Sequence, residues 1–260
     1  MGYQGYICKK IVEHLRVKPE NVALISDFVD TEFMRPDPKL RKMYREKLGL
    51  EDSEFVVLYV GRIIPQKGLH HLLTAFAKDI RSRDMKLLIV GARGHFHVQD
   101  LTYFNYLEHL ITSLGIRERV LYLGRISREQ LPGIYNACDA VAVPTLMEEG
   151  GLLLTNLEAM ACGKPVIAYN SGALREAIIH GKTGMLIEKG DINRFSLSLL
   201  QLAEDPAYRN RLGYSARRLC EEKFDIRKIV DKTMKLYLKY ISVKANEGGF
   251  LSTGVPSPVV

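Results

Sequence analysis

Runs of hydrophobic residues without polar alternation recur along the middle of the chain, and a helical pattern follows each of them. The first run is Phe55–Val60, and a helix is expected at 69–80. Continuous apolar runs of this length are typical of strands buried on both faces, as in a parallel sheet covered by helices. The further strands are expected at Lys86–Val90, Val120–Leu123, Ala140–Val143, Val166–Ala168 and Gly184–Ile187.

Helical patterns fill the intervals between these runs and predict the crossover connections of a sheet. Helices are expected at 101–114, 128–137, 155–161 and 174–179, and further helices fill 193–240. This alternation predicts an α/β fold with a doubly wound, Rossmann-like parallel sheet of six strands. Ligands bind such sheets at the carboxyl ends of the strands, so the loops that follow the strands are the places to look for a site.

The two ends of the chain do not follow this pattern. A short amphipathic helix is expected at 7–15 and a strand-like run at Val22–Ile25, whereas Asn246–Val260 is rich in Gly, Pro and small residues and is expected to be a flexible tail. One helix and one strand cannot form a core. The first 35 residues therefore either cap the following domain or form the end of another domain.

Composition narrows the class of protein without giving a function. The chain has 260 residues, is 47% hydrophobic and 26% charged, and has a formal net charge of +7. It is long enough to bury a large core, and it is neither disordered, collagen-like nor disulfide-dense. The start is not that of a signal peptide and the four cysteines form no C-x-x-C pair, so a cytoplasmic protein with reduced thiols is expected. The positive charge favours an anionic ligand or a membrane surface, and because no nucleic-acid-binding motif is present, nucleic acid is not an expected partner.

The loop after the first expected strand, V-G-R-I-I-P-Q-K-G, places two cations beside the start of a helix. Gly61 allows a sharp turn at the strand end, and Arg62 and Lys67 stand five positions apart. Two cations at a helix N-terminus suit a phosphate or a diphosphate. The alternative is two solvated surface cations, and the loop is not a Walker motif.

The loop after the fourth expected strand carries two carboxylates and two glycines. These residues are Glu148, Glu149, Gly150 and Gly151. The glycines let backbone N–H groups approach a ligand, and Glu158 lies about one turn inside the helix that opens near Thr155. A carboxylate there suits paired hydroxyls such as a ribose diol, and free N–H groups suit phosphate. The alternatives are a helix-dipole partner for Glu158 and a solvated loop for the other two carboxylates.

The remaining loops give weaker signals. The second lacks G-x-G-x-x-G, and its His95 and His97 have no carboxylate or Cys at ligand spacing, so no metal site is expected. In the third loop, Arg125 faces either a ligand or solvent, and Ser127 with Gln130 is expected to form a capping box.

Four segments in order resemble the C-terminal, donor-binding domain of GT-B glycosyltransferases of family 4, the group 1 type. They are V-G-R-I-I-P-Q-K-G, L-G-R-I-S-R-E-Q-L-P-G-I-Y-N-A-C-D-A, L-E-A-M-A-C-G-K-P-V-I-A and H-G-K-T-G-M-L-I-E-K-G-D. The resemblance covers roughly residues 20–240. It implies retaining transfer of a sugar from a nucleotide diphosphate sugar to a sugar or lipid acceptor, with no cofactor and no metal. The alternatives are a non-catalytic nucleotide-sugar-binding or scaffold module, and an epimerase or phosphorylase on the same fold.

The resemblance also implies roles for single residues. Arg62 and Lys67 match the pair that binds the donor diphosphate. Glu158 matches the second Glu of the E-x7-E motif, which contacts the ribose, and the backbone at Leu154 and Thr155 matches the phosphate contacts.

Two further roles follow from the same resemblance. The loop containing Arg125 and Ile126 lies near the base in this family. The first Glu of E-x7-E contacts the donor sugar, but the matching position here is Gly150, so Glu148 or Glu149 takes that role and the choice stays open.

The resemblance implies a division of the chain as well. Residues 1–35 are expected to be a remnant of an N-terminal domain with its linker, 36–225 the nucleotide-sugar-binding domain, 226–244 a helix that crosses back to the N-terminal domain, and 245–260 the tail. The chain is then a fragment or one half of a split enzyme. The acceptor, and any peripheral membrane contact, belong to the N-terminal domain.

Overall fold

The computed structural model describes residues 3–79, 84–92, 98–148 and 153–246. Outside these ranges lie the predicted tail beyond residue 246 and the candidate residues His95, His97, Glu149, Gly150 and Gly151.

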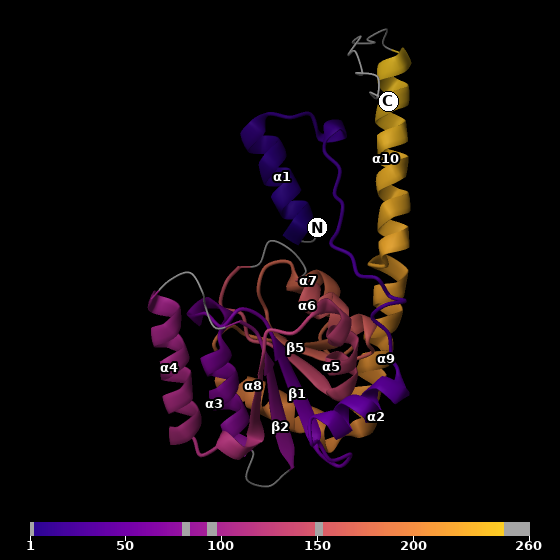
Figure 1. The fold of residues 1–260 in the computed structure, drawn as a ribbon. Coiled ribbons are helices and arrows are strands. Elements are labelled where there is room, and N and C mark those ends of the chain that lie inside the picture. Colours follow the sequence, from indigo (N-terminus) through magenta and orange to yellow (C-terminus); the bar gives the residue numbers. More distant parts are fainter. Residues whose placement is uncertain (1–2, 80–83, 93–97, 149–152, 247–260) are drawn as a thin grey trace, which may run out of the picture.

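A six-stranded, all-parallel sheet forms the centre of the molecule, with the strand order β3-β2-β1-β4-β5-β6 (Figure 1). The strands are β1 (Phe55–Val60), β2 (Met85–Val90), β3 (Val120–Gly124), β4 (Ala140–Val143), β5 (Val166–Tyr169) and β6 (Gly184–Ile187). This order confirms the doubly wound α/β prediction. The chain winds outward in both directions from β1 and β4, so the order reverses between these two strands.

Helices cover both faces of the sheet and give it two hydrophobic cores. One face packs against α3 (Leu69–Asp79), α4 (Val98–Ser113) and α8 (Ile192–Glu204), and the other against α5 (Leu131–Ala137), α6 (Leu154–Ala161) and α9 (Pro206–Lys223). Along β1, Val57 and Tyr59 belong to the first core and Val56 and Leu58 to the second. Burial on both faces explains why the strand sequence is continuously apolar.

Several helices differ from their expected bounds for local reasons. The helix expected at 128–137 starts as a 3-10 turn, η5 (Arg128–Gln130), before α5. The helix expected at 174–179 is the shorter α7 (Leu174–Ala177). It ends early because the Thr183 hydroxyl donates to the carbonyl of Ala177 and accepts from the N–H of Ile179. Further short turns in the described residues are η1 (Pro19–Asn21), η2 (Pro65–Lys67) and η4 (Arg117–Arg119).

The prediction of a strand at Val22–Ile25 is wrong. This segment has no strand partner among the described residues, and the carbonyl of Leu24 accepts from the Lys232 ammonium at 2.8 Å instead. A strand forms only where its backbone groups meet a neighbouring strand. The segment is extended coil beside the C-terminal helix.

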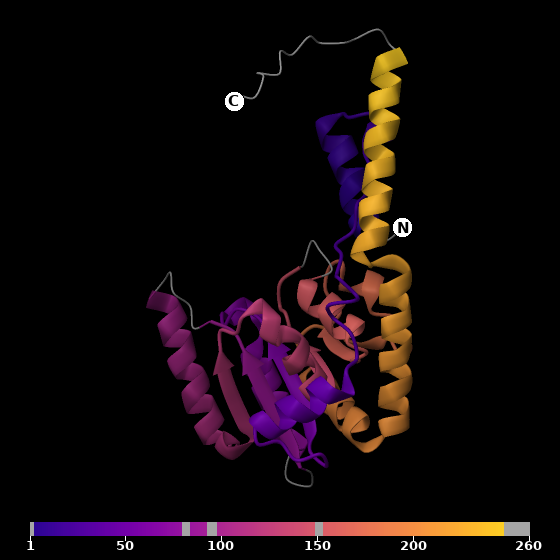
Figure 2. The same cartoon turned by 45° about the vertical axis from the view of Figure 1, so that its right-hand side comes forward.

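The first and last helices lie above the carboxyl ends of the strands. Helices α1 (Tyr3–Leu15) and α10 (Ile226–Asn246) both extend away from the sheet, and α10 is the longer (Figures 1 and 2). Helix α10 runs two residues past its expected end at 244. Its exposed apolar side chains include Met234, Tyr237, Leu238 and Ile241.

In the described ranges, no helix combines the length and apolar character needed to cross a bilayer. The division into domains stays a prediction.

Hydrogen bonds join the N-terminal segment to the junction between α9 and α10. The N–H of Val29 donates to the carbonyl of Phe224 at 2.9 Å, and the N–H of Ile226 donates to that of Val29 at 3.0 Å. The buried carboxylate of Asp225 accepts from the Thr31 hydroxyl and from the Arg227 guanidinium. The start of α10 is therefore fixed on the domain.

Helix α2 (Pro38–Lys47) follows the N-terminal segment and packs on α5. Its N-cap is Asp37, whose carboxylate accepts from the N–H groups of Lys39 and Leu40 at 2.9 and 3.0 Å. Cys138, Cys162 and Cys220 are buried free thiols, as expected.

Candidate functional site

A small hollow of about 70 Å³ opens where the strand order reverses, at the carboxyl ends of β1 and β4. Gly61 and Lys67 from the loop after β1, and Leu153 and Thr155 from the start of α6, are among its lining residues. The structure therefore brings together three residues that the sequence singled out in two separate loops, Gly61 and Lys67 after β1 and Thr155 after β4. This is the position at which doubly wound sheets bind their ligands.

The loops after β1 and β4 touch at Gly68. This glycine has φ +68°, and a Cβ placed on it would lie 2.0 Å from the carbonyl oxygen of Pro144. Next to this contact, the N–H of Leu146 donates to the carbonyl of Gln66 at 2.8 Å. Only glycine allows both the backbone conformation and the close approach, so Gly68 fixes the cationic loop against the loop after β4.

Helix α6 starts at this hollow without a side-chain cap. Its N-cap residue, Leu153, has φ 60° and ψ 124°, a conformation that costs energy for a branched residue. The hydroxyl of Thr155 donates to the carbonyl of Val60 at 3.4 Å and ties the first turn of the helix to the end of β1. The first N–H groups of α6 are thus not satisfied by a capping side chain, which suits an anion.

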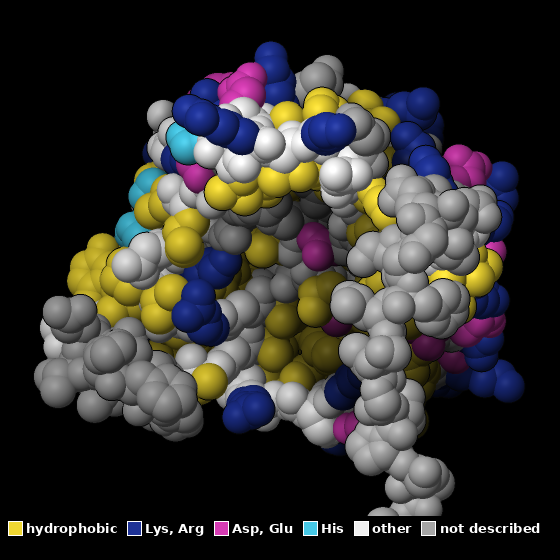
Figure 3. Space-filling model, turned by 90° about the horizontal axis from the view of Figure 1, so that it is seen from above, with side chains coloured by type: hydrophobic (Ala, Val, Ile, Leu, Met, Phe, Trp, Pro, Cys, Tyr) yellow, Lys and Arg dark blue, Asp and Glu magenta, His cyan; other side chains and the backbone are white. Residues whose placement is uncertain are grey.

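A larger hollow of about 520 Å³ adjoins α6 on the side of the N-terminal segment. Phe33, Ile126, Arg128, Leu154 and Glu158 are among its lining residues. Seen from above, this face of the molecule is hollowed, with many hydrophobic side chains and an acidic one inside the hollow (Figure 3). An apolar hollow with a few polar groups suits a flat organic ring that carries hydroxyl groups.

The carboxylate of Glu158 is oriented from the neighbouring helix. The Tyr135 hydroxyl donates to it across 2.8 Å, and Tyr135 itself is buried. Burial raises the pKa of the Glu158 carboxyl, while the hydrogen bond from Tyr135 lowers it in part. Glu158 therefore keeps a carboxylate oxygen at the hollow in a fixed orientation.

Glu148 connects the loop after β4 to two further loops. It accepts from the N–H of Gly172, in the loop after β5, at 2.8 Å, and it forms an ion pair with Lys189, which follows β6. The hydrogen bond from Lys189 lowers the pKa of the Glu148 carboxyl, and the N–H of Gly172 lowers it further. Glu148 is thus ionised and held at the carboxyl ends of three strands.

Two other cations predicted for the site, Arg62 and Arg125, are not among the residues that line the small hollow, unlike Lys67. The side chain of Arg62 is exposed, and its carbonyl accepts from the Tyr59 hydroxyl at 2.8 Å. Arg125 is also exposed, and Arg128, three residues further on, lines the large hollow. The capping box of Ser127 and Gln130 is confirmed.

Sequence reasoning missed Phe33, which lines the larger hollow, and Tyr135 and Lys189, which contact Glu158 and Glu148. Lys189 follows a parallel strand, so the rule that sites gather at the carboxyl ends of strands could have found it. Tyr135 and Phe33 gave no such signal, because they reach the site through the packing of α5 and of the N-terminal segment. Within the described ranges, no three His, Cys, Asp or Glu side chains come together as a metal site.

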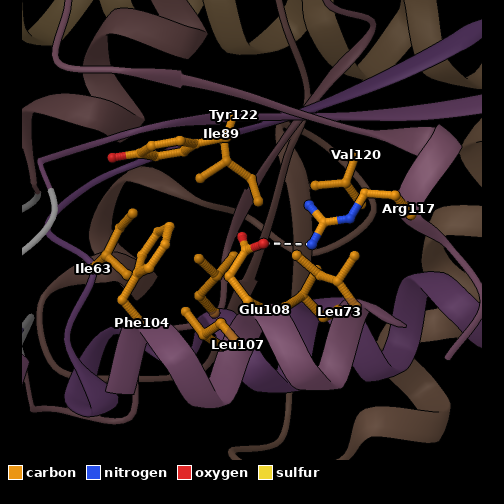
Figure 4. A pocket seen from close by; sticks show the side chains of 11 residues that line it. Ile63, Leu73, Ile89, Phe104, Leu107, Glu108, Arg117, Val120 and Tyr122 are labelled. Atoms are coloured by element: carbon orange, nitrogen blue, oxygen red, sulfur yellow. Dashed lines mark hydrogen bonds and ion pairs between the residues drawn. The ribbon is translucent and has the colours of Figure 1, made fainter. Parts of the chain in front are cut away.

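A third cavity lies away from these loops, between α3, α4 and the sheet. Figure 4 shows apolar side chains around it, among them Ile63, Leu73 and Phe104, and the ion pair of Glu108 with Arg117. Its volume is about 20 Å³, which is room for about one water molecule. This cavity is a packing defect of the core and not a candidate ligand site.

Comparison with known proteins identifies the family of this chain. The family model of the glycosyl transferases group 1 matches residues 41–219. The D-inositol 3-phosphate glycosyltransferase of Rhodococcus jostii is 35% identical over 216 residues, which are 82% of this chain and 46% of that protein. The chain thus spans about half the length of the curated relatives it matches.

Solved structures give the same result for the fold. HepE of Anabaena in complex with UDP is 26% identical with a TM-score of 0.80, over 89% of this chain and 61% of that one. It is also solved with UDP-glucose. Sucrose-phosphate synthase from Thermosynechococcus elongatus is 27% identical with a TM-score of 0.79, over 94% of this chain and 58% of that one. The sheet described here is one half of a GT-B fold, and the chain belongs to the glycosyl transferases group 1.

Proposed function

We propose that this chain is the donor-binding half of a retaining glycosyltransferase that uses a nucleotide diphosphate sugar. The observation that carries the proposal is the hollow between β1 and β4, where Lys67, the uncapped start of α6 and Thr155 meet. Support comes from HepE, a structural neighbour that has been solved with UDP and with UDP-glucose.

In this proposal, different residues bind different parts of the nucleotide diphosphate sugar. Arg62, Lys67 and the backbone at Leu154 and Thr155 bind the diphosphate. Glu158 accepts hydrogen bonds from the ribose hydroxyls, and the hollow beside it takes the base. Glu148 faces the donor sugar.

The proposed reaction breaks the bond between the anomeric carbon of the sugar and the diphosphate oxygen. The acceptor hydroxyl forms its bond to the same face of that carbon and passes its proton to the departing diphosphate oxygen. Negative charge develops on the departing diphosphate, and Arg62 and Lys67 stabilise it. In this proposal the cations act without a metal ion.

The acceptor, a sugar or a lipid, is proposed to lie on a separate N-terminal domain, together with any membrane contact. The matched relative and the neighbour sucrose-phosphate synthase are named for transfer or synthesis, which does not favour a scaffold or an epimerase.

The test is calorimetric titration of the chain with UDP, GDP and ADP, each with Mg²⁺ and with EDTA. Saturable binding of one nucleotide, equal in both conditions, is the expected result. Absence of binding for all three would overturn the donor-binding role of this chain, and binding only with Mg²⁺ would overturn the metal-independent part.

A further inference from the structure

A second polar hollow lies at the opposite end of the sheet, where β4 and β5 begin. Its volume is about 260 Å³. Arg41 from α2, Asp139 before β4, Lys164 before β5, and Arg209 and Asn210 from α9 are among its lining residues. The carboxyl-end hollows of the proposed donor site share none of these residues.

Positive charge exceeds negative charge in this hollow. Asp139 is the one carboxylate among its lining residues, against the three cations Arg41, Lys164 and Arg209. Both oxygens of Asp139 are engaged, one by Arg41 at 2.8 Å and the other by the N–H of Val56 at 2.8 Å and by Arg45 at 3.4 Å. A second carboxylate, Asp205, acts on Arg209 from the start of α9.

Two of the cations retain donors for a ligand. The Lys164 ammonium donates to the carbonyls of Asn136 and Cys138 at 3.1 and 2.8 Å, which leaves one of its three hydrogens. Arg209 lies over the ring of Phe55, 5.3 Å from its centroid, and the hydrogen bond described for it is from Nη1 to the carbonyl of Leu202 at 2.7 Å. Its Nε and Nη2 groups have no other partner among the described residues.

The concentration of positive charge in this hollow destabilises the charged forms of its basic side chains. Burial lowers the pKa of the Lys164 ammonium. The nearby Arg41 lowers it further, while Cys138 and Asp139 act in the opposite direction. Burial also lowers the pKa of the Arg209 guanidinium. Asp139 and Asp205 raise it, whereas Arg41 and Arg45 lower it. The attraction of an anion in the hollow would offset the repulsion that these cations exert on one another.

We infer that this hollow binds a phosphate group, free or as the monoester of a small sugar. The remaining donors of Lys164 and Arg209 match the oxygens of a tetrahedral dianion, and Arg41, whose Nη groups donate to the Asn136 and Cys138 carbonyls and to Asp139, adds positive charge beside them. The volume of about 260 Å³ corresponds to roughly nine waters at about 30 Å³ each, which is enough for a phosphate with a small organic group. A bound phosphate would cross-link the turn before β5 to α9, and so stabilise the fold.

The test uses the whole chain with Arg62→Ala and Lys67→Ala, so that phosphate bound at the proposed donor site does not contribute. Inorganic phosphate and glucose 6-phosphate are titrated separately by calorimetry at constant ionic strength. Saturable binding of either is expected. Similar affinities indicate a site for free phosphate, and tighter binding of the sugar phosphate indicates a monoester.

Two variants locate the site. Arg209→Gln removes the donors, and Asn210→Asp adds a carboxylate while leaving the described hydrogen bonds intact. Each is expected to weaken binding about ten-fold or more. The matched control is Arg218→Gln on the same helix, since Arg218 is exposed and pairs with Glu222. Absence of binding in the parent, or unchanged binding in Asn210→Asp, would overturn the inference.

Discussion

The Tyr135 hydroxyl donates to a carboxylate oxygen of Glu158 across 2.8 Å, from α5 to α6. The two helices pack on the same face of the sheet and both border the large hollow. Tyr135 is buried and cannot turn toward solvent, so it sets the direction of the carboxylate. A ribose bound by Glu158 would therefore meet an oriented acceptor.

Nucleotide affinity should depend on the ionisation of Glu158. Burial raises the pKa of this carboxyl, so the protonated form persists to higher pH than in an exposed Glu. Ionised Glu158 accepts ribose hydroxyls, and affinity for the nucleotide should therefore rise with pH through this pKa and then level off. Ionisation in the buried position also reduces the stability of the free protein over the same interval. Calorimetric titrations between about pH 5 and 8 measure the effect.

Two variants isolate this titration. Tyr135→Phe removes the hydrogen bond that lowers the pKa of Glu158, so the midpoint should move to higher pH. Glu158→Gln leaves only the titration of the ligand phosphate. An identical pH profile in the parent and in Glu158→Gln would show that Glu158 does not contact the ligand.

The affinity for the diphosphate group of the nucleotide should depend on the two cations of the loop after β1. Arg62→Ala and Lys67→Ala are each expected to weaken UDP about ten-fold or more, because a charged hydrogen bond contributes about 1.5–3 kcal/mol. Binding of uridine, which lacks the phosphates, should not change. Lys42→Ala is the matched control, since Lys42 is exposed on α2. Equal losses for UDP and uridine would point to misfolding rather than to lost phosphate contacts.

The contact between the two loops predicts a stability difference between two glycines. Gly68 and Gly115 both have φ +68°, but a Cβ meets Pro144 at Gly68 and nothing within 4 Å at Gly115. Gly115→Ala is expected to cost about 1–2 kcal/mol of the free energy of unfolding. Gly68→Ala should cost about 1–3 kcal/mol more, because the loops must separate. Urea denaturation of both variants tests this, and equal losses would contradict the close approach.

Lys189 is expected to act on the donor sugar through Glu148. Lys189→Met removes the ion pair that holds Glu148, so the affinity for a nucleotide sugar should fall while that for the nucleotide alone stays unchanged. Lys189→Arg should restore most of the difference. The pair is partly exposed, and an effect of about three-fold is expected from a surface ion pair of up to about 1 kcal/mol. Parallel titrations with UDP-glucose and UDP separate the sugar from the nucleotide, and equal changes for both ligands would contradict the role.

The junction before α10 should lose stability in acid. Hydrogen bonds from Arg227 lower the pKa of Asp225 far below its usual range. Because the folded-state pKa is depressed, this stabilisation is complete above the unfolded pKa and is lost as the pH falls toward the folded value. Asp225→Asn should cost about 1–3 kcal/mol at neutral pH, since it weakens a buried, charged acceptor. The exposed Asp231→Asn is the control, and equal unfolding free energies for the two variants would contradict the prediction.

The sequence by itself determined the six strands, their parallel arrangement and the two loops that line the candidate site. Strands such as Phe55–Val60 are buried on both faces, so hydrophobicity alone marks them. The sequence also predicted that Gly61 and Lys67 of one loop lie near Thr155 of another, because parallel strands present their carboxyl ends at one edge of the sheet.

Tertiary packing decided what local pattern does not encode. Val22–Ile25 has the composition of a strand but no partner, and Arg128 rather than Arg125 lines the large hollow. Glu148 and Lys189 are 41 residues apart and meet only because β4, β5 and β6 are neighbours. Such contacts depend on the distance between elements after folding, which the spacing of residues along the chain does not contain.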